Sequence, residues 1–586
     1  MRLNWVHHTI KRAVLPVFAL VLLAGPASAQ APAQPEAATG YSPQKAATGQ
    51  KFMVSTSHPL ATQVGYDILA RGGTAADAGV AVQLVLGLVE PQSSGLGGGG
   101  FALYYDAKTK KLSTLDGRET APSTAGKHLF RGENGKPMKF YDAAVGGRSV
   151  GVPGTPALLH KLHEWYGKLP WRDLFSPAIT LAETGFAVTP RLAALVTAER
   201  SRMSVSTDGK LYFFPDSSTP VYEGYKLVNP LYARTLRTLA LEGVGPFYKG
   251  EIAERIVIAT RESRRNPGLM SIEDMASYEV KERAPVCGPY RGYKICSMGE
   301  PSSGGLTLIS ALGMLEQFNM AAMGPQDPKA WHLIIEASRL AFADRNYFMA
   351  DPDFVKTPGM ALVDPSYLKN RAALISPEGP MKAAMPGTPP GWVEEPRFPD
   401  EQIKPPGTTH VSIVDSYGNV LSMTSSIEDA FGSRMMVEGF LLNNQLTDFA
   451  FEPDYEGKDV ANRAQGGKRP RSSMAPVIMF DAAGKPVLVI GSAGGSAIIG
   501  YVLERIVALV DWKMGLQEAL DMPNIVNRGA ATEVENGAET LENQLKNFGH
   551  VVETSDLTSG LTAIEMKNGT LTGAADPRRE GVARGE

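Results

Sequence analysis

The sequence predicts an α/β protein, and two patterns together with the size of the chain support this fold class. Residues 60–71 and 75–88 space their apolar side chains as buried helices do, and residues 150–275 are mainly helical by the same criterion. Beyond residue 408, short runs of alternating apolar and polar residues are typical of strands. With 586 residues, 43% of them hydrophobic, the chain can form two to four domains or one large α/β body.

The N-terminus has the layout of a secretory signal peptide. Basic residues precede an apolar run over 13–24, and small residues then follow up to Ala29. A run of about a dozen residues is too short to span a bilayer, so we predict cleavage after Ala29 and no stable membrane insertion. Residues 1–29 are then a signal peptide, and the mature chain is exported to a periplasmic or extracellular compartment. An uncleaved membrane anchor is the alternative.

Composition argues against nucleic-acid partners, and we expect neither a metal nor a cofactor. The 58 Lys and Arg residues and 61 Asp and Glu residues are scattered, with a net charge of −3, so no basic face is visible. His160 and His163 have no carboxylate or cysteine at ligand spacing. The glycine-rich run 95–100 lacks the Lys-Ser/Thr of a P-loop, so we interpret it as tight backbone packing near a site rather than nucleotide binding.

Helices and strands are expected in order along the rest of the chain. We expect helices over 156–166, 171–185, 190–203, 229–242, 250–261, 305–318, 331–349, 497–510 and 539–547, and strands over 101–105, 111–115, 409–414, 420–425, 440–442, 476–480 and 486–490. Residues 376–407, with many Pro and Gly residues and no periodicity, are expected to form an exposed linker.

The two cysteines, Cys287 and Cys296, flank a predicted hairpin with its turn near Arg291-Gly292. In an oxidising compartment a cross-strand disulfide is plausible, since the turn would set the cysteines opposite each other. Two unpaired buried thiols are the alternative, because the register of the hairpin is not fixed by the sequence.

The linker delivers Thr408 to the first position of a strand. The Pro- and Gly-rich lead 401–407 can be neither helix nor central strand, whereas the residues after Thr408 alternate as a strand does. If the bond between Gly407 and Thr408 were cut, Thr408 would carry a hydroxyl nucleophile and a free α-amine that can take its proton as a general base. The alternative is an ordinary strand start after a loop.

Two further features suit acyl chemistry. The run 491–496 joins a buried strand to an apolar helix, and consecutive glycine N–H groups at a helix N-terminus can stabilise an oxyanion. A structural strand-to-helix turn is the alternative. Arg118 follows a predicted strand and can bind a carboxylate with two hydrogen bonds, although most Arg residues are solvated surface.

Taken together, the motifs resemble one family over nearly the whole mature chain: the γ-glutamyltransferases, or γ-glutamyltranspeptidases, which are self-cleaving N-terminal-nucleophile hydrolases. The matching motifs are SGLGGGGF at 94–101, DGRE at 116–119, PSSGG at 301–305, TTH at 408–410, LNNQ at 442–445, DF at 448–449, RPRSSM at 469–474 and GG at 494–495. Their order and type together are highly specific.

The resemblance implies a four-layer αββα sandwich built from two subunits of one precursor, the large subunit 30–407 and the small catalytic subunit 408–586. It implies Thr408 as nucleophile and new N-terminus. The residues with other implied roles are Gly494 and Gly495 for the oxyanion hole, Arg118, Ser472 and Ser473 for the α-carboxylate of a γ-glutamyl donor, and Gln445 and Asp448 for its α-amine.

The sequence departs from the family pattern at two positions and in one segment. Ser426 stands where the family usually has a Thr that orients the nucleophile, and Glu428 stands where it has an Asn near the α-amine. Ser426 keeps a hydroxyl at its position. Glu428 places a carboxylate where the family has an amide, while Gln445 places an amide where some members carry Glu, so the two side-chain types are exchanged. The segment 450–467 is shorter than in members with a lid, so Tyr455 is an open candidate for that role.

We therefore expect an exported enzyme that cleaves γ-glutamyl amides such as glutathione through a γ-glutamyl ester on Thr408. Its partners would be small molecules, the γ-glutamyl donor and water or an amino acid or peptide amine as acceptor. A related acylase that cleaves glutaryl or similar amides is the nearest alternative. An uncleaved, inactive binding protein of the cell envelope is the alternative from another class.

Overall fold

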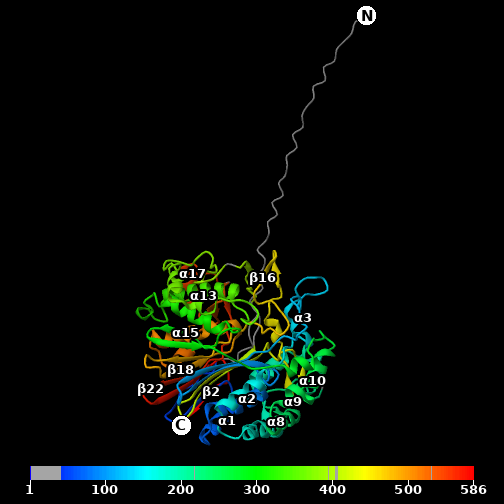
Figure 1. Ribbon diagram of the computed structural model, residues 1–586. Coiled ribbons are helices and arrows are strands. Elements are labelled where there is room, and N and C mark those ends of the chain that lie inside the picture. The colour runs from blue at the N-terminus through cyan, green and yellow to red at the C-terminus, as the bar shows by residue number, and fades with distance from the viewer. Residues whose placement is uncertain (2–40, 217, 394, 403–406, 530) are drawn as a thin grey trace.

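The computed structural model has an αββα arrangement (Figure 1). The residues that it describes are 1, 41–216, 218–393, 395–402, 407–529 and 531–586. The predicted signal peptide beyond Met1 and the Pro405-Pro406 dipeptide lie outside these residues. No helix in the described ranges has the length and apolar character needed to cross a membrane.

Two seven-stranded antiparallel sheets form the centre of the molecule. The first sheet has the order β24 (Val582–Gly585), β2 (Met53–Thr56), β11 (Gly407–Val414), β12 (Val420–Glu428), β3 (Gly99–Asp106), β4 (Lys111–Gly117), β7 (Lys281–Arg283). The second has the order β1 (Ala47–Gly49), β23 (Thr570–Ala575), β22 (Thr562–Lys567), β18 (Pro486–Gly491), β17 (Val477–Phe480), β9 (Tyr293–Ser297), β8 (Val286–Tyr290).

Alternation along the strands explains why the sheets pack face to face. On β3, Phe101 and Leu103 belong to the core shared with the second sheet, whereas Ala102 and Tyr104 belong to the core beneath the helices of the first sheet. Because side chains of a strand point alternately to its two faces, each sheet has one face on the other sheet and one on helices.

Each outer face of the sandwich is covered by helices (Figure 1). The first sheet is covered by α1 (Pro59–Ala70), α2 (Ala75–Val89), α4 (Thr155–Tyr166), α5 (Ser176–Thr184) and α8 (Pro230–Glu242). The second is covered by α12 (Gly304–Leu315), α13 (Pro328–Phe348), α15 (Ile498–Val510) and α16 (Leu516–Asp521). The predicted four-layer αββα fold is therefore confirmed.

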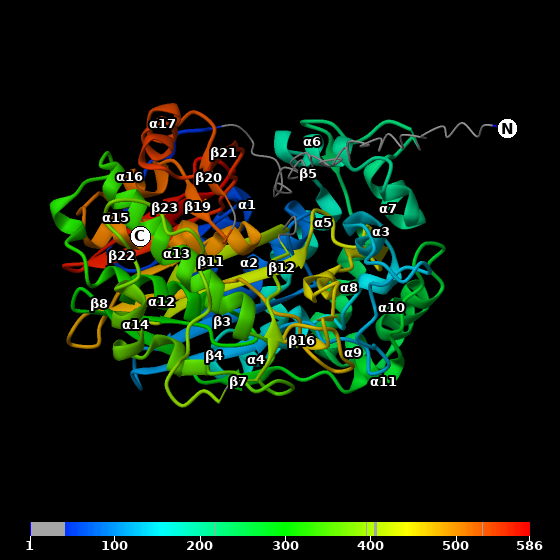
Figure 2. The same cartoon turned by 90° about the horizontal axis from the view of Figure 1, so that it is seen from above.

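The remaining elements surround this sandwich. The helices are α3 (Phe140–Ala144), α6 (Pro190–Ala198), α7 (Thr207–Phe213), α9 (Gly245–Lys249), α10 (Glu251–Arg261), α11 (Ile272–Ala276), α14 (Pro365–Ala372) and α17 (Glu539–Phe548). The short strands are β5 (Phe186–Ala187), β6 (Lys226–Leu227), β10 (Arg397–Phe398), β13 (Met436–Val437), β14 (Phe440–Leu441), β15 (Asp454–Tyr455), β16 (Lys458–Val460), β19 (Ile525–Asn527), β20 (Thr532–Glu535) and β21 (Val552–Ser555). Figure 2 shows β19, β20, β21 and α17 gathered at one end of the molecule.

Most of the predicted elements are present, with shifted ends. The helix expected over 171–185 begins only at Ser176, after a short 3-10 turn at Trp171–Leu174, because Pro177 occupies the first turn of α5. The linker 376–407 is not wholly irregular, since β10 pairs in parallel with β16. The prediction that the strand begins at Thr408 is wrong by one residue, because Gly407 already pairs with Glu428 as the first residue of β11, an inner strand of the first sheet.

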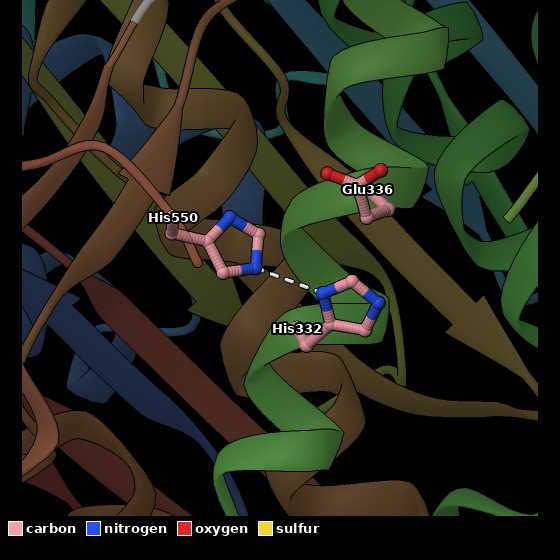
Figure 3. Close-up of side chains that lie close together, drawn as sticks. All are labelled: His332, Glu336 and His550. Atoms are coloured by element: carbon pink, nitrogen blue, oxygen red, sulfur yellow. Dashed lines mark hydrogen bonds between the residues drawn. The ribbon is translucent and has the colours of Figure 1, made fainter. Parts of the chain in front are cut away.

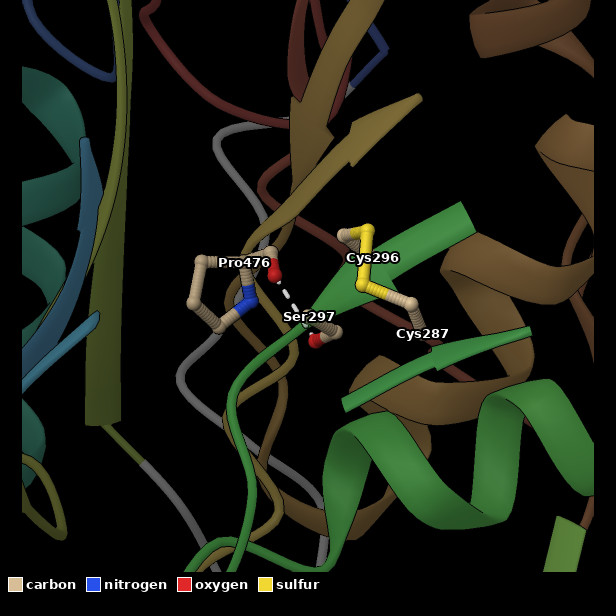
Figure 4. The surroundings of a disulfide bond; sticks show 4 residues. All are labelled: Cys287, Cys296, Ser297 and Pro476. Carbon is tan, nitrogen blue, oxygen red and sulfur yellow. Dashed lines mark hydrogen bonds between the residues drawn. A yellow bond between two sulfur atoms is a disulfide. The ribbon is translucent and has the colours of Figure 1, made fainter. Parts of the chain in front are cut away.

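Cys287 and Cys296 face each other directly in the β8–β9 hairpin and form a disulfide, with Cα atoms 4.2 Å apart (Figure 4). The neighbouring Ser297 donates a hydrogen bond of 2.7 Å to the carbonyl of Pro476, which ties β9 to the start of β17. The bridge thus closes the edge hairpin of the second sheet.

Candidate active site

Thr408 lies at the start of β11, opposite Ser426 on β12, and both residues are buried. The Thr408 hydroxyl donates a 3.2 Å hydrogen bond to Ser426 Oγ. Ser426 in turn donates a 2.5 Å hydrogen bond to the carbonyl oxygen of Gly407 and accepts one of 2.9 Å from the backbone N–H of Glu428. A single serine hydroxyl therefore links the Thr408 side chain to the carbonyl of the preceding peptide bond.

The glycine-rich run before β3 allows this close arrangement. A Cβ atom on Gly98 would lie 2.2 Å from the carbonyl oxygen of Ser426, and one on Gly97 would lie 2.1 Å from that of Leu441. Real Cβ atoms cannot come so close, so these positions require glycine. The interpretation of this run as tight backbone packing near a site is confirmed.

Arg118 follows β4 directly and is anchored by backbone carbonyls. Its Nε donates to Pro470 O over 3.1 Å, and its Nη2 donates to Arg471 O over 3.2 Å. The same guanidinium forms an ion pair of 2.5 Å with Asp448 and lies 3.8 Å from Glu119. Burial raises the pKa of Glu119 to about 8, and the nearby charge of Arg118 only partly offsets this effect.

Gln445 and Asp448 both lie on the short 3-10 turn Gln445–Asp448, so their side chains come from one segment. Gln445 Nε2 donates a 2.9 Å hydrogen bond to Asp448 Oδ2, the oxygen that also binds Arg118. Glu428, at the end of β12, accepts a hydrogen bond from Asn444 and has a positive φ of 81°. The implied amine-binding groups are therefore adjacent, and Asp448 is already paired with the implied carboxylate-binding arginine.

Ser472 and Ser473 lie against the PSSGG segment, which forms the start of α12. Ser303 N–H donates to Ser472 O over 2.9 Å, and Ser302 pairs with Ser472 as a parallel bridge. Ser472 Oγ accepts from the N–H of Met474 over 3.1 Å. The motif at 301–305 thus holds the backbone of Ser472 in place.

Gly494 and Gly495 form the turn between β18 and α15, with φ angles of 130° and 55°. A Cβ atom on Gly494 would lie 2.5 Å from the ring of Tyr501, so this turn needs glycine. Gly495 lines the same cavity as Thr408. The oxyanion role of this turn stays a prediction.

One cavity of about 60 Å³ brings nearly all of the predicted site residues together. The predicted residues that line it are Arg118, Thr408, Ser426, Glu428, Gln445, Asp448, Ser472, Ser473 and Gly495. Gly494 is the exception, since only its neighbour in the turn reaches the cavity wall.

Sequence reasoning missed several residues of the cavity wall, among them Arg345, Asp400 and Arg471. Arg471 lies inside the RPRSSM motif and could have been found there. Asp400, its ion-pair partner at 3.0 Å, comes from the predicted linker, where no local pattern marks it. Arg345 lies on the helix α13, in a stretch that otherwise indicates only a buried helix.

Tyr455 does not line the cavity. It packs on Phe398, with ring centroids 4.5 Å apart, and the residue is 51% exposed. In this structure Tyr455 therefore does not act as a lid over Thr408.

Three buried residues, His332, Glu336 and His550, form a cluster whose ligand-type atoms lie within 4.8 Å of one another (Figure 3). His332 Nδ1 and His550 Nε2 are joined by a hydrogen bond of 2.8 Å, and His332 Nε2 bonds to Ser376 O over 2.7 Å. Both Glu336 oxygens are used as well, one by Arg339 and one by the N–H of Met381. The internal hydrogen bonds account for this cluster without an ion.

Comparisons with known proteins identify the family of this chain. A family model described as gamma-glutamyltranspeptidase matches residues 61–586. The glutathione hydrolase proenzyme of Bacillus subtilis (strain 168) is 36% identical over 585 residues, which cover 97% of each chain. The glutathione hydrolase proenzyme of Escherichia coli (strain K12) is 36% identical over 571 residues, covering 94% of this chain and 95% of that one.

Among solved structures, a cephalosporin acylase from Bacillus halodurans superposes with a TM-score of 0.81 at 26% identity. The superposition covers 92% of this chain and 97% of the acylase. Both the sequence likeness and the structural likeness extend over nearly the whole chain. This chain therefore belongs to the gamma-glutamyltranspeptidase family.

Proposed function

We propose that this protein is a self-processing γ-glutamyltransferase and glutathione hydrolase with Thr408 as its nucleophile. The single observation that carries the proposal is the placement of the Thr408 hydroxyl in a cavity with Arg118, Asp448 and the two serines of the RPRSSM motif. These groups match the two charged ends of an α-amino acid. The glutathione hydrolase proenzymes named above support the same activity.

The first step is cleavage of the precursor into subunits 30–407 and 408–586. Thr408 Oγ1 attacks the carbonyl carbon of Gly407, and its proton passes through the Ser426 hydroxyl to the carbonyl oxygen, along the two hydrogen bonds described above. The C–N bond then breaks, the nitrogen of Thr408 takes up a proton, and Gly407 remains as an ester on Oγ1. Water hydrolyses this ester and leaves a free α-amine on Thr408.

The second step is turnover of the donor. The new α-amine takes the Thr408 hydroxyl proton while Oγ1 attacks the γ-carbonyl carbon of the donor, and the N–H groups of the Gly494–Gly495 turn, of which Gly495 lines the cavity, stabilise the oxyanion. The leaving amine receives the proton as the C–N bond breaks, and a γ-glutamyl ester remains. Water or an acceptor amine then attacks the ester and releases glutamate or a new γ-glutamyl amide.

Donor recognition uses the charged walls of the cavity. The α-ammonium of the donor replaces Arg118 as the partner of Asp448, with Gln445 and Glu428 beside it. The α-carboxylate is bound by Arg118, Ser472 and Ser473. Residues 1–29 would direct the precursor to an exported location, as their composition predicts.

One gel and one assay test the proposal. Purified wild type should show two bands of roughly 40 and 19 kDa, at the mean residue mass of this chain. It should also release the anilide from a γ-glutamyl anilide. Thr408→Ala should remain a single band without activity. A single band in wild type, or normal cutting in Thr408→Ala, overturns the proposal and favours an uncleaved binding protein.

The second candidate is an acylase acting on glutaryl or similar amides. It is favoured by the likeness to the cephalosporin acylase, which extends over 92% of this chain. The two candidates share the nucleophile and differ in the α-amine of the donor, so the choice depends on what Asp448 binds.

A further inference from the structure

Arg345 is a buried cation in the cavity wall that has no carboxylate partner within the described ranges. It lies on α13 and is 7% exposed. The other two arginines of the cavity are paired, Arg118 with Asp448 and Arg471 with Asp400. Burial lowers the pKa of Arg345 well below its usual range, because a charged group is costly where it is neither hydrated nor paired. The position therefore suits a ligand that brings a negative charge.

The guanidinium of Arg345 is used to hold two serine hydroxyls. Its Nε donates to Ser303 Oγ over 2.9 Å, and its Nη2 donates to Ser473 Oγ over 2.7 Å. Its Nη1 donates to Asn346 Oδ1 over 2.8 Å. Because guanidinium groups only donate, both hydroxyl oxygens must accept, and this fixes where the hydroxyl protons can go.

The hydroxyl protons of Ser472 and Ser473 are left for a ligand. Ser303 donates its own proton to Ser472 O over 2.6 Å, so that hydroxyl is satisfied. Ser473 Oγ accepts from Arg345 and Ser472 Oγ accepts from the N–H of Met474. Among the residues placed in the structure, neither hydroxyl has an acceptor for its proton. Both serines therefore present O–H donors to the cavity, and a carboxylate is the acceptor that two adjacent O–H donors fit.

We propose that Arg345 is a positioning residue for the donor: it orients Ser473 as a hydrogen-bond donor and supplies the positive charge that draws the α-carboxylate to the serine pair. The inference rests on the proposed function and deepens it. The cavity wall carries three arginines and three carboxyl residues, Asp400, Glu428 and Asp448, so a donor end with one ammonium and one carboxylate keeps the charges matched.

A lysine cannot replace Arg345 in this role. Nε and Nη2 of one planar group reach Ser303 and Ser473 together, whereas a lysine has one nitrogen on a flexible stem. The charge-conserving variant Arg345→Lys should therefore recover the attraction to the carboxylate but not the orientation of Ser473. Its donor KM should lie between those of wild type and Arg345→Gln.

The test compares two donors that differ only in the α-carboxylate: γ-glutamyl anilide and 4-aminobutanoyl anilide. For γ-glutamyl anilide, Arg345→Gln should raise KM by about ten- to a hundred-fold with a smaller change in kcat, the range for losing hydrogen bonds that involve a charged group. For 4-aminobutanoyl anilide, kcat/KM should stay within about threefold of wild type. Arg339→Gln, the same change about one and a half to two turns earlier on the same helix and outside the cavity wall, is the matched control and should change neither.

If Arg345→Gln does not yield cut, folded protein, Ser473→Ala tests the same inference. It should raise KM for γ-glutamyl anilide and leave 4-aminobutanoyl anilide unchanged, and adding Arg345→Lys to it should cause little further loss because both act through one hydroxyl. Equal losses for both donors in the Arg345 variants overturn this inference while leaving the proposed function intact. A wild type that cleaves neither donor overturns the proposed function, and the inference with it.

Discussion

Arg118 and Asp448 form a direct ion pair of 2.5 Å inside the cavity, and the side chain of Arg118 is 1% exposed while that of Asp448 is 25% exposed. In the proposed donor complex, each residue is the partner that the other loses when the α-amino acid end of the donor binds. The exchange is balanced only if the donor carries both an ammonium and a carboxylate. The pair therefore predicts a preference for donors with an α-amine, which a comparison of two donors can measure.

Wild type should cleave a γ-glutamyl anilide better than the matching glutaryl anilide, which lacks the α-amine. A glutaryl carboxylate that takes Arg118 leaves Asp448 without a cation, and breaking a buried charge pair costs about 2–5 kcal/mol. Since water reaches Asp448, we expect the low end, about thirty-fold in kcat/KM. Asp448→Asn should bring the ratio toward one, whereas Asp454→Asn, in the exposed pair with Lys127, should not change it. A wild-type ratio within about threefold would favour the acylase.

Ser426→Ala should slow cutting of the precursor by about a hundred-fold or more, because the variant loses the hydroxyl that bonds to the Gly407 carbonyl. Ser426→Thr should restore most of the rate, since it keeps a hydroxyl. Ser425→Ala is the matched control, because that hydroxyl points away from Thr408 and donates to Gln83. A time course of the two bands on a gel measures the rates. Equal cutting in Ser426→Ala and wild type would contradict the relay through Ser426.

Glu119→Gln should stabilise the protein increasingly as the pH rises from about 4.5 to about 8. Burial raises the pKa of Glu119 to about 8 in the folded chain, so the folded state binds a proton that the unfolded state has lost in this range. Wild type thus loses about 1.4 kcal/mol of stability per pH unit at this site until pH 8, and Gln removes the loss. Tm measured at pH 5, 6.5, 8 and 9 should show a growing difference that levels off. A difference in Tm that is constant across this pH range would contradict the raised pKa of Glu119.

The double variant Cys287→Ala/Cys296→Ala should lose at most about 2–3 kcal/mol in free energy of unfolding, because the bridge closes a short loop. Its kcat/KM should equal that of wild type, since neither cysteine lines the cavity. Mass spectrometry without reduction tests the bridge itself in exported wild type. Two free thiols there would show that the hairpin is closed without it.

Much of the site could be predicted because its residues lie in short sequence motifs. The Thr408 strand start, the glycine turn at 494–495 and the serines at 472–473 each have a local pattern with a physical reason. The close packing at Gly97 and Gly98 could also be predicted from the sequence, since a run of glycines before a strand indicates backbones that approach each other. The αββα layering followed from the family resemblance rather than from periodicity.

The remaining parts of the site depend on contacts that no local pattern carries. Arg345 looks like any arginine of a buried helix, and its role becomes visible only when α13 is packed beside Ser303 and Ser473. Asp400 lies in a Pro- and Gly-rich segment without periodicity, yet it pairs with Arg471 in the cavity wall. The Arg118–Asp448 pair was missed because each residue had already been assigned to the substrate.

The order of strands in the two sheets has a consequence for how the enzyme must be made. In the proposed mature protein, β11 and β12 of the small subunit lie between β2 and β3 of the large one, and β17, β18, β22 and β23 lie between β1 and β9. Either piece synthesised alone would expose unpaired strand edges, which invite aggregation. We therefore expect that the two subunits expressed from separate genes do not assemble as the single precursor does. On this view the sheets form before the chain is cut.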